Sequence, residues 1–167
     1  KFALKKCGEG IVILYDCDLP YFGYLTKLIS LLKKGEKFVT IDRRAYDSKF
    51  DKSKLNFYQI SRYLVSKCVN IVISNLITKN FKGDTQSGLK GFYIDKKFKK
   101  EEFISTKFFL DAEIISYFTN RNVKIFSIPI NYKISKQSSI KIFDLNNFVY
   151  LYELIKVIIF GLVKFRN

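Results

Sequence analysis

Histidine is absent from this chain of 167 residues, and its absence excludes histidine metal ligands, histidine general bases and the Ser-His and Cys-His pairs of nucleophilic enzymes. Any chemistry must therefore rest on carboxylates, lysine, arginine, tyrosine or backbone groups. Methionine is absent as well, so we expect the chain to be a piece of a longer protein. Cysteine is scarce: Cys7, Cys17 and Cys68 show no metal-site spacing and no disulfide framework, which suits a reducing compartment.

Acidic residues are few compared with basic ones. The chain has 30 lysines and arginines against 15 aspartates and glutamates, which gives a net charge of +15. This excess favours anionic partners such as phosphorylated substrates, anionic lipid head groups or nucleic acid. A hydrophobic content of 48% over this length suffices for the core of one α/β domain and is too small for two.

A hydrophobic run at residues 11–15 leads directly into Asp16 and Asp18. The pattern predicts a buried strand that ends at a site, because ligands of open α/β sheets lie beyond the carboxyl ends of the strands. Two carboxylates one residue apart can share a hard cation that holds a diphosphate. The competing interpretation is an acidic turn after a strand.

A second strand follows the first. Residues 24–34 predict a helix, and residues 38–41 predict a strand that ends just before Arg43. A right-handed connection makes the two strands parallel in one sheet. We therefore expect Arg43 to lie close to Asp16 and Asp18.

The segment 83–92 contains three glycines within a polar stretch. We interpret it as a loop that allows the backbone to approach a ligand closely, with Asp84 and Gln86 offering a carboxylate and an amide. The alternative is a surface loop with a turn.

Three further elements are expected. Residues 106–120 predict a helix with Asp111 as its N-cap and Glu113 in its first turn. Residues 124–132 predict an edge strand, because a proline interrupts them. Residues 55–75 predict a long helix with an apolar side, which carries Ile60, Tyr63, Leu64, Val69, Ile71 and Val72.

The C-terminal stretch, residues 146–166, predicts an amphipathic helix. Its uncharged run is too short to span a membrane, so we expect it to lie on a membrane surface, with lysines near anionic head groups. The alternative is a helix packed on the sheet. The polar residues of the helix form a narrow stripe of Asn146, Glu153, Lys156 and Lys164.

Six short motifs occur in order along the chain: Asp16-Cys-Asp18, Asp42-Arg-Arg44, Asp84-Thr-Gln-Ser-Gly88, Leu110-Asp-Ala-Glu113, Ile128-Pro-Ile-Asn-Tyr132 and Ser138-Ser-Ile-Lys141. Together they resemble family 2 glycosyltransferases, most closely the dolichyl-phosphate and polyprenyl-phosphate sugar synthases and among these the dolichyl-phosphate glucosyltransferase branch. The resemblance covers essentially the whole chain.

The resemblance implies an α/β fold of the GT-A type, a Rossmann-like mixed sheet flanked by helices. Residues 1–143 would form the C-terminal two-thirds of the catalytic domain, and residues 144–167 would form the amphipathic, membrane-interfacial helix. In such enzymes the first strand and the acids that hold the nucleotide base precede the point where Lys1 lies. We therefore expect this segment alone to have no useful turnover.

The family moves a hexose from a nucleotide sugar, of the UDP-glucose or GDP-mannose type, to a polyprenyl phosphate with inversion. The resemblance implies that Asp16 and Asp18 hold Mg²⁺ or Mn²⁺ against the donor diphosphate, and that Arg43 and Lys141 bind phosphate. It also implies a peripheral or tethered protein at the cytoplasmic face of a membrane.

Four further residues would line the substrate cleft. Asp84, Asp111 and Glu113 match acids of the family's cleft and are the catalytic candidates, and Gln86 would lie beside the substrate. The family's usual arginine next to the first of these acids is Gly83 here.

The missing histidine agrees with this chemistry. A phosphomonoester has its second ionisation at about pH 6, so the acceptor oxygen is already largely deprotonated at neutral pH. The enzyme then needs a metal for the departing diphosphate, cations for the acceptor phosphate and in-line geometry. A sugar hydroxyl acceptor would instead need a carboxylate base, for which Asp84 or Asp111 would be the candidates.

Two alternatives belong to other functional classes. The charge and the aromatic content of 17% suit a basic nucleic-acid-binding module. However, the aromatic residues have core-like spacing and no nucleic-acid motif occurs, so we expect no nucleic-acid partner. The second alternative is a catalytically incomplete, membrane-associated pseudoenzyme.

Overall fold

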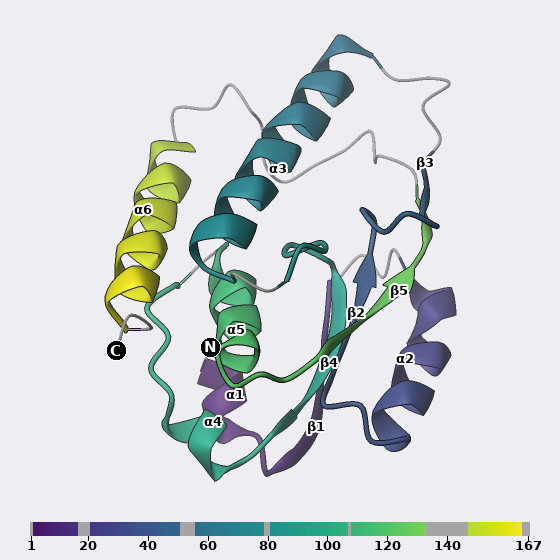
Figure 1. Ribbon diagram of the computed structural model, residues 1–167, viewed down its shortest axis with the longest axis vertical. Helices are drawn as coiled ribbons and strands as arrows, with labels where there is room; N and C mark the ends of the chain where they lie inside the picture. The colour runs from purple at the N-terminus through teal and green to yellow at the C-terminus, as the bar shows by residue number, and fades with distance from the viewer. Residues whose placement is uncertain are drawn as a thin grey trace.

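A computed structural model describes residues 2–16, 21–50, 56–78, 81–106, 108–132 and 147–164. It has a mixed α/β architecture, in which a four-stranded sheet is flanked by helices (Figure 1). The α/β class predicted from the sequence is thus confirmed. Asp18 and Lys141, two of the predicted site residues, lie outside the described residues.

The sheet has the strand order β1-β4-β2-β5. Its strands are β1 (Gly10–Tyr15), β4 (Leu89–Ile94), β2 (Phe38–Asp42) and β5 (Ile125–Pro129). Both β1 and β2 pair with β4 in antiparallel fashion, so they run in the same direction, as predicted, with β4 between them. Strand β5 pairs in parallel with β2 at the edge of the sheet, and its terminal proline fits that edge position.

Strand β4 corrects the prediction of a loop over residues 83–92. The loop ends at Gly88, and the next six residues form an inner strand. A Cβ at Gly91 would lie 2.5 Å from Leu32 and 2.8 Å from Leu28. Glycine therefore belongs to the strand here, because it lets the adjacent helix approach the sheet.

The sheet separates two apolar clusters. Phe38 and Phe92 face a cluster that also includes Phe118 of α5 (Leu110–Thr119), and the Phe38 ring lies 5.4 Å from the Phe92 ring. Residues on the other face of the sheet pack against α2 (Leu25–Lys33), which ends before Gly35. Full burial of each large apolar side chain contributes about 1.5–3 kcal/mol, so these clusters hold the sheet between its helices.

Short elements complete the core region. Helix α1 (Phe2–Lys6) and helix α4 (Lys96–Lys100) contribute Leu4 and Phe98 to the cluster on the α5 face. A single 3-10 turn, η1 (Phe22–Tyr24), precedes α2. Strand β3 (Lys49–Phe50) pairs in parallel with β6 (Asn131–Tyr132).

Helix α3 (Phe57–Leu76) begins at a capping box formed by Asn56 and Gln59. The predicted apolar side of this helix is buried only in part, since Val69 packs against the cluster that contains Ile73 while other residues of that side face solvent. Ile60, Leu64 and Ile71 are 43%, 53% and 49% exposed, whereas the buried residues are Gln59, Asn70, Ile73 and Ser74. The buried polar side chains serve contacts that a helical periodicity does not reveal.

Helix α6 (Asn147–Lys164) lies beside α3 (Figure 1). Its residues Leu154 and Val157 pack in one cluster with Ile73 of α3 and Ala112 of α5, so the helix is docked on the protein. Every described helix falls short of the length and apolarity that a membrane span requires.

The predicted polar stripe of α6 was wrong at Glu153, which is 8% exposed. Its carboxylate accepts hydrogen bonds from Ser105 Oγ (2.7 Å), Thr106 N (2.8 Å) and Phe108 N (3.0 Å). The acid therefore anchors α6 to the segment that leads into α5.

Candidate active site

The carboxyl end of β1 carries the first predicted metal ligand, Asp16. Its backbone N–H donates to the carbonyl oxygen of Gly88 at 2.9 Å. Its carboxylate lies so close to Gly88 that a Cβ at that position would overlap it. A glycine just before β4 thus leaves the room in which the Asp16 carboxylate lies.

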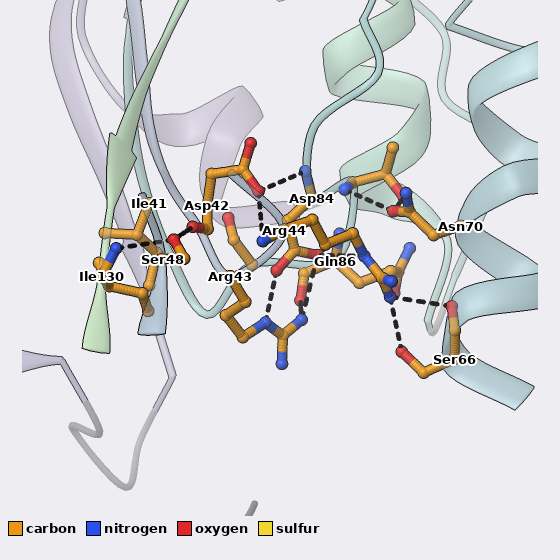
Figure 2. Close-up of polar contacts among 12 residues, drawn as sticks. Ile41, Asp42, Arg43, Arg44, Ser48, Ser66, Asn70, Asp84, Gln86 and Ile130 are labelled. Carbon is orange, nitrogen blue, oxygen red and sulfur yellow. Dashed lines mark hydrogen bonds and ion pairs between the residues drawn. The ribbon is translucent and has the colours of Figure 1, made fainter. Parts of the chain in front are cut away.

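Arg43 lies just beyond the end of β2 and forms a bidentate pair with Asp84 (Figure 2). Arg43 Nε donates to Asp84 Oδ2, and Arg43 Nη2 donates to Asp84 Oδ1 at 3.1 Å. The same Nη2 donates to the carbonyl oxygen of Gln86 at 2.8 Å. The Arg43 side chain is still 27% exposed, whereas that of Asp84 is fully buried.

Charge pairing keeps both partners ionised. Burial by itself raises the pKa of Asp84, but the attraction and hydrogen bonds of Arg43 outweigh it and hold that pKa below its ordinary value. Burial by itself lowers the pKa of Arg43, and Asp84 reverses this and raises it. A carboxylate held in this way is a poor proton acceptor, because its conjugate acid is disfavoured.

Asp42, the last residue of β2, organises the loop around this pair. Its Oδ1 accepts hydrogen bonds from the backbone N–H groups of Arg44 (2.8 Å) and Asp84 (3.2 Å). A Cβ at Gly83 would lie 2.5 Å from Asp42 Oδ2, so the glycine at this position fits the packing. Burial raises the pKa of Asp42, and the nearby Asp84 charge raises it further.

Asn70 of α3 holds the same loop from the other side. Its Oδ1 accepts hydrogen bonds from Thr85 N (2.9 Å) and Thr85 Oγ1 (2.8 Å), and its Nδ2 donates to the Gly83 carbonyl at 3.1 Å. Sequence reasoning missed this residue. The available signal was a lone amide within an otherwise apolar stretch of a long helix.

Tyr21 links the metal candidate to the arginine pair. The charges that act on its hydroxyl include Arg43, Asp84 and Asp16, and it is hydrogen-bonded with Arg43. Burial raises the pKa of this hydroxyl, and the Arg43 charge opposes that effect. The contacts themselves bring these groups together. The Asp16 carboxylate lies against Gly88, and the loop that ends at Gly88 carries Asp84 and the Gln86 carbonyl, both of which accept from Arg43. Asp16, Arg43, Asp84 and the Gln86 backbone therefore gather at one edge of the sheet.

The other two predicted cleft acids belong to α5. The predicted N-cap was wrong: the cap is Phe109, and Asp111 lies in the first turn. Asp111 forms an ion pair with Lys90 of β4. Glu113 is buried, and its carboxylate accepts the backbone N–H groups of Ile104 (2.9 Å) and Ser105 (2.7 Å).

Glu113 thus holds the segment that precedes α5. It also lines a small cavity with Ser116 and Val157, between α5 and α6. This placement gives Glu113 a clear structural role, separate from the edge of the sheet where Asp16 and Arg43 gather.

Several buried donor groups lie at or near that edge. Among the described residues, four buried side-chain atoms have no hydrogen-bond partner: Tyr15 Oη, Arg44 Nε, Gln86 Nε2 and Lys90 Nζ. All four can donate a hydrogen bond. Buried donors of this kind suit an anionic ligand, because its oxygens can accept the missing bonds.

A carboxylate such as Asp16 is a suitable ligand for Mg²⁺ or Mn²⁺. Within the described ranges, no group of three or more aspartate, glutamate, cysteine or histidine side chains is arranged to hold a metal ion. The second acid of the motif, Asp18, is outside those ranges.

No protein-family model matches the chain, and no curated protein is significantly similar to it. The chemistry of the residues that the fold brings together is therefore the basis of any functional assignment.

Proposed function

We propose that this chain is part of a metal-dependent family 2 glycosyltransferase with a GT-A fold. It would transfer a hexose from a nucleotide sugar of the UDP-glucose or GDP-mannose type to a polyprenyl phosphate, with inversion. The observation that carries the proposal is the gathering of Asp16, Arg43 and Asp84 at one edge of the sheet. These residues come from separate segments and combine a metal-ligating carboxylate with a cation for phosphate.

Asp16, with Asp18, would hold Mg²⁺ or Mn²⁺. The bound metal would stabilise the charge that develops on the departing nucleoside diphosphate. Arg43 would contact a phosphate group through the 27% of its side chain that is exposed. Lys141 is the second proposed phosphate ligand.

Asp84 would act by positioning Arg43. Both of its oxygens accept from the guanidinium, and the pKa of this carboxyl is lowered. These features suit a permanent counter-charge better than a general base. A phosphate acceptor needs no such base, because it is already largely ionised at neutral pH.

The acceptor lipid requires a membrane surface, and α6 and α3 offer an apolar one. The two helices lie side by side (Figure 1). Lysines 67 and 156 are exposed on them and can meet anionic head groups. The exposed apolar residues are Phe57, Ile60, Leu64, Val65, Ile71 and Leu76 of α3 and Phe148, Val149, Leu151, Tyr152, Ile155, Ile159 and Val163 of α6. We refer to these residues as the two-helix apolar surface.

This surface would seat the protein at the cytoplasmic face of a membrane, in a peripheral or tethered manner. The lipid-linked phosphate would then be presented at the same membrane surface. The membrane and the acceptor lipid are thus parts of one proposal.

The test measures transfer of radiolabelled sugar from UDP-glucose or GDP-mannose into the organic phase with a polyprenyl phosphate. The natural full-length protein is assayed with and without Mn²⁺. We expect metal-dependent labelling that is lost in Asp16→Asn and Asp18→Asn and retained in Asp47→Asn, which changes an exposed carboxylate.

Other outcomes point to the other classes. A folded protein that binds a nucleotide sugar but transfers nothing would be the pseudoenzyme. A protein that binds neither nucleotide, but binds nucleic acid with steep salt dependence, would be the basic module.

A further inference from the structure

Lys90 is a buried lysine near the beginning of β4, an inner strand of the sheet. It is 1% exposed and lies on β4, between β1 and β2, where it pairs with Leu14 and Thr40. Burial of an ammonium group is costly unless it is paired and hydrogen-bonded. A lysine at this position therefore needs anionic neighbours.

The structure supplies one such neighbour. Lys90 Nζ forms an ion pair with Asp111, whose side chain is 30% exposed. However, the ammonium makes no hydrogen bond of good geometry among the described residues, although it carries three N–H donors. The pair is thus electrostatically balanced but incomplete as a hydrogen-bonded unit.

The position of Lys90 relates it to the proposed metal ligand. Side chains two residues apart on a strand project from the same face. Asp16 lies two residues beyond Leu14, the cross-strand partner of Lys90, and the Asp16 carboxylate lies against Gly88, two residues before Lys90. The buried ammonium and the Asp16 carboxylate therefore belong to the same face of the sheet, close to its site edge.

We propose that Lys90 is a phosphate-binding residue of the candidate site at this edge of the sheet. In the free protein Asp111 holds the ammonium in place, and on binding a phosphate oxygen of the substrate accepts the hydrogen bond that is missing. The inference rests on the proposed function and adds a ligand to it. The phosphate belongs to the nucleotide donor or to the lipid acceptor, and the same chemistry serves both.

A purely structural role of the Lys90–Asp111 pair would change substrate binding in a different way. If Lys90 served only to hold Asp111, removal of either partner would weaken substrate binding alike. If Lys90 binds phosphate, removal of the lysine weakens binding, whereas removal of the aspartate charge frees the ammonium. The two single variants should then act in opposite directions.

The experiment measures calorimetric binding to the natural full-length protein with Mn²⁺. The probes are UDP, GDP and a short-chain prenyl phosphate, with uridine, guanosine and the prenol as phosphate-free controls. For Lys90→Met we expect binding of one phosphate class to weaken by roughly 10- to 100-fold, the loss of one charged hydrogen bond. The class of probe whose binding weakens, nucleoside diphosphate or prenyl phosphate, identifies the source of the phosphate.

Asp111→Asn should bind the same probe as tightly as the wild type or more tightly. Lys33→Met, at an exposed lysine of α2, should change nothing. Lys90→Arg keeps the charge and should retain more affinity than Lys90→Met. If Lys90→Met does not fold, the double variant Lys90→Met/Asp111→Leu replaces the pair by apolar groups and should show the same loss of phosphate affinity.

Unchanged binding of both phosphate classes in Lys90→Met would overturn the inference and leave the proposed function intact, provided that wild-type binding depends on Mn²⁺. An equal loss in Lys90→Met and Asp111→Asn would also overturn it. If the wild type bound no nucleoside diphosphate and no prenyl phosphate, the proposed function would fail together with the inference.

Discussion

The Arg43 guanidinium holds the fully buried Asp84 carboxylate through both of its oxygens. This contact joins the end of β2 to the loop that precedes β4. Asp42 and Asn70 fasten the same loop through its backbone. The charged centre of the candidate site is therefore part of the folded framework, and such preorganisation would favour binding of the proposed phosphate ligand.

Asp84→Asn should destabilise the protein at neutral pH by about 2–4 kcal/mol, somewhat less than for a fully buried pair because Arg43 is partly exposed. The pKa of Asp84 is lowered in the folded state. Its contribution is thus fully present above the unfolded value of about 3.9 and is lost as the pH falls through the folded pKa.

Urea unfolding of wild type and Asp84→Asn at pH 7 and near pH 2.5 measures this contribution. We expect the difference in unfolding free energy to shrink at the lower pH. Asp47→Asn, an exposed site, serves as the control. An equal difference at both pH values would contradict the assignment of the charge to the pair.

Asp42→Asn should show the opposite pH dependence. The pKa of Asp42 is raised by burial and by the nearby Asp84 charge, so protonation favours the folded state. Its contribution to stability is greatest below the unfolded value of about 3.9 and is lost as the pH rises through the folded pKa. The asparagine can still accept the two backbone hydrogen bonds through its amide oxygen.

The unfolding free energy of the wild type relative to Asp42→Asn should therefore increase as the pH falls from 7 to 3. Thermal or urea unfolding at unit pH steps measures it. A constant difference over this range would refute a raised pKa at Asp42.

Much of the fold could be predicted from periodicity. The first two strands, α2 and the proline-bearing edge strand have apolar patterns that reflect one buried face or edge, so local sequence suffices for them. Strand β4 was missed because Lys90 and Gly91 interrupt its pattern. The reason for both residues lies in contacts with segments distant in sequence. Gly91 lets α2 approach the sheet, and Lys90 forms an ion pair with Asp111.

The site was predictable only in part, for the same reason. The sequence pattern predicts where strands end and where loops turn, and the candidate residues at such positions are Asp16, Arg43 and Asp84. Asn70 and Glu153 each form hydrogen bonds with a loop that is distant in sequence. The periodicity of a helix cannot predict such contacts. Buried polar residues on apolar helices are the signal to search for in similar chains.

Gly88→Ala should impair metal-dependent activity with little loss of fold. Its Cβ would overlap the Asp16 carboxylate and so displace the proposed metal ligand. A displacement of about 1 Å at a reacting centre can reduce the rate by about 100-fold. Gly23→Ala is the matched control, because nothing lies within 4 Å of a Cβ at that position.

Mn²⁺-dependent sugar transfer and thermal unfolding should be measured on both glycine variants. We expect the activity of Gly88→Ala to fall and that of Gly23→Ala to stay at the wild-type level. Full Mn²⁺-dependent activity in Gly88→Ala would show that the Asp16 carboxylate does not need its present position.

The two-helix apolar surface should bind vesicles. Leu151 and Ile159 of α6 are 53% and 57% exposed, so the double change Leu151→Asp/Ile159→Asp should reduce co-sedimentation with vesicles of anionic lipid by about tenfold. Leu64→Asp, on α3, should act in the same direction if both helices contact the lipid. Because these side chains already face solvent, the urea midpoint should hardly change.

Tyr46→Asp is the control for added negative charge, since this side chain is fully exposed and belongs to neither helix. Added salt should weaken vesicle binding of the wild type only in part. Salt screens the attraction between the lysines and the anionic lipid, but it does not weaken the contribution of the apolar side chains buried in the lipid. Equal losses for Tyr46→Asp and the α6 variant would assign the binding to net charge alone. Loss confined to the variants of the two helices would instead assign the vesicle binding to the two-helix apolar surface.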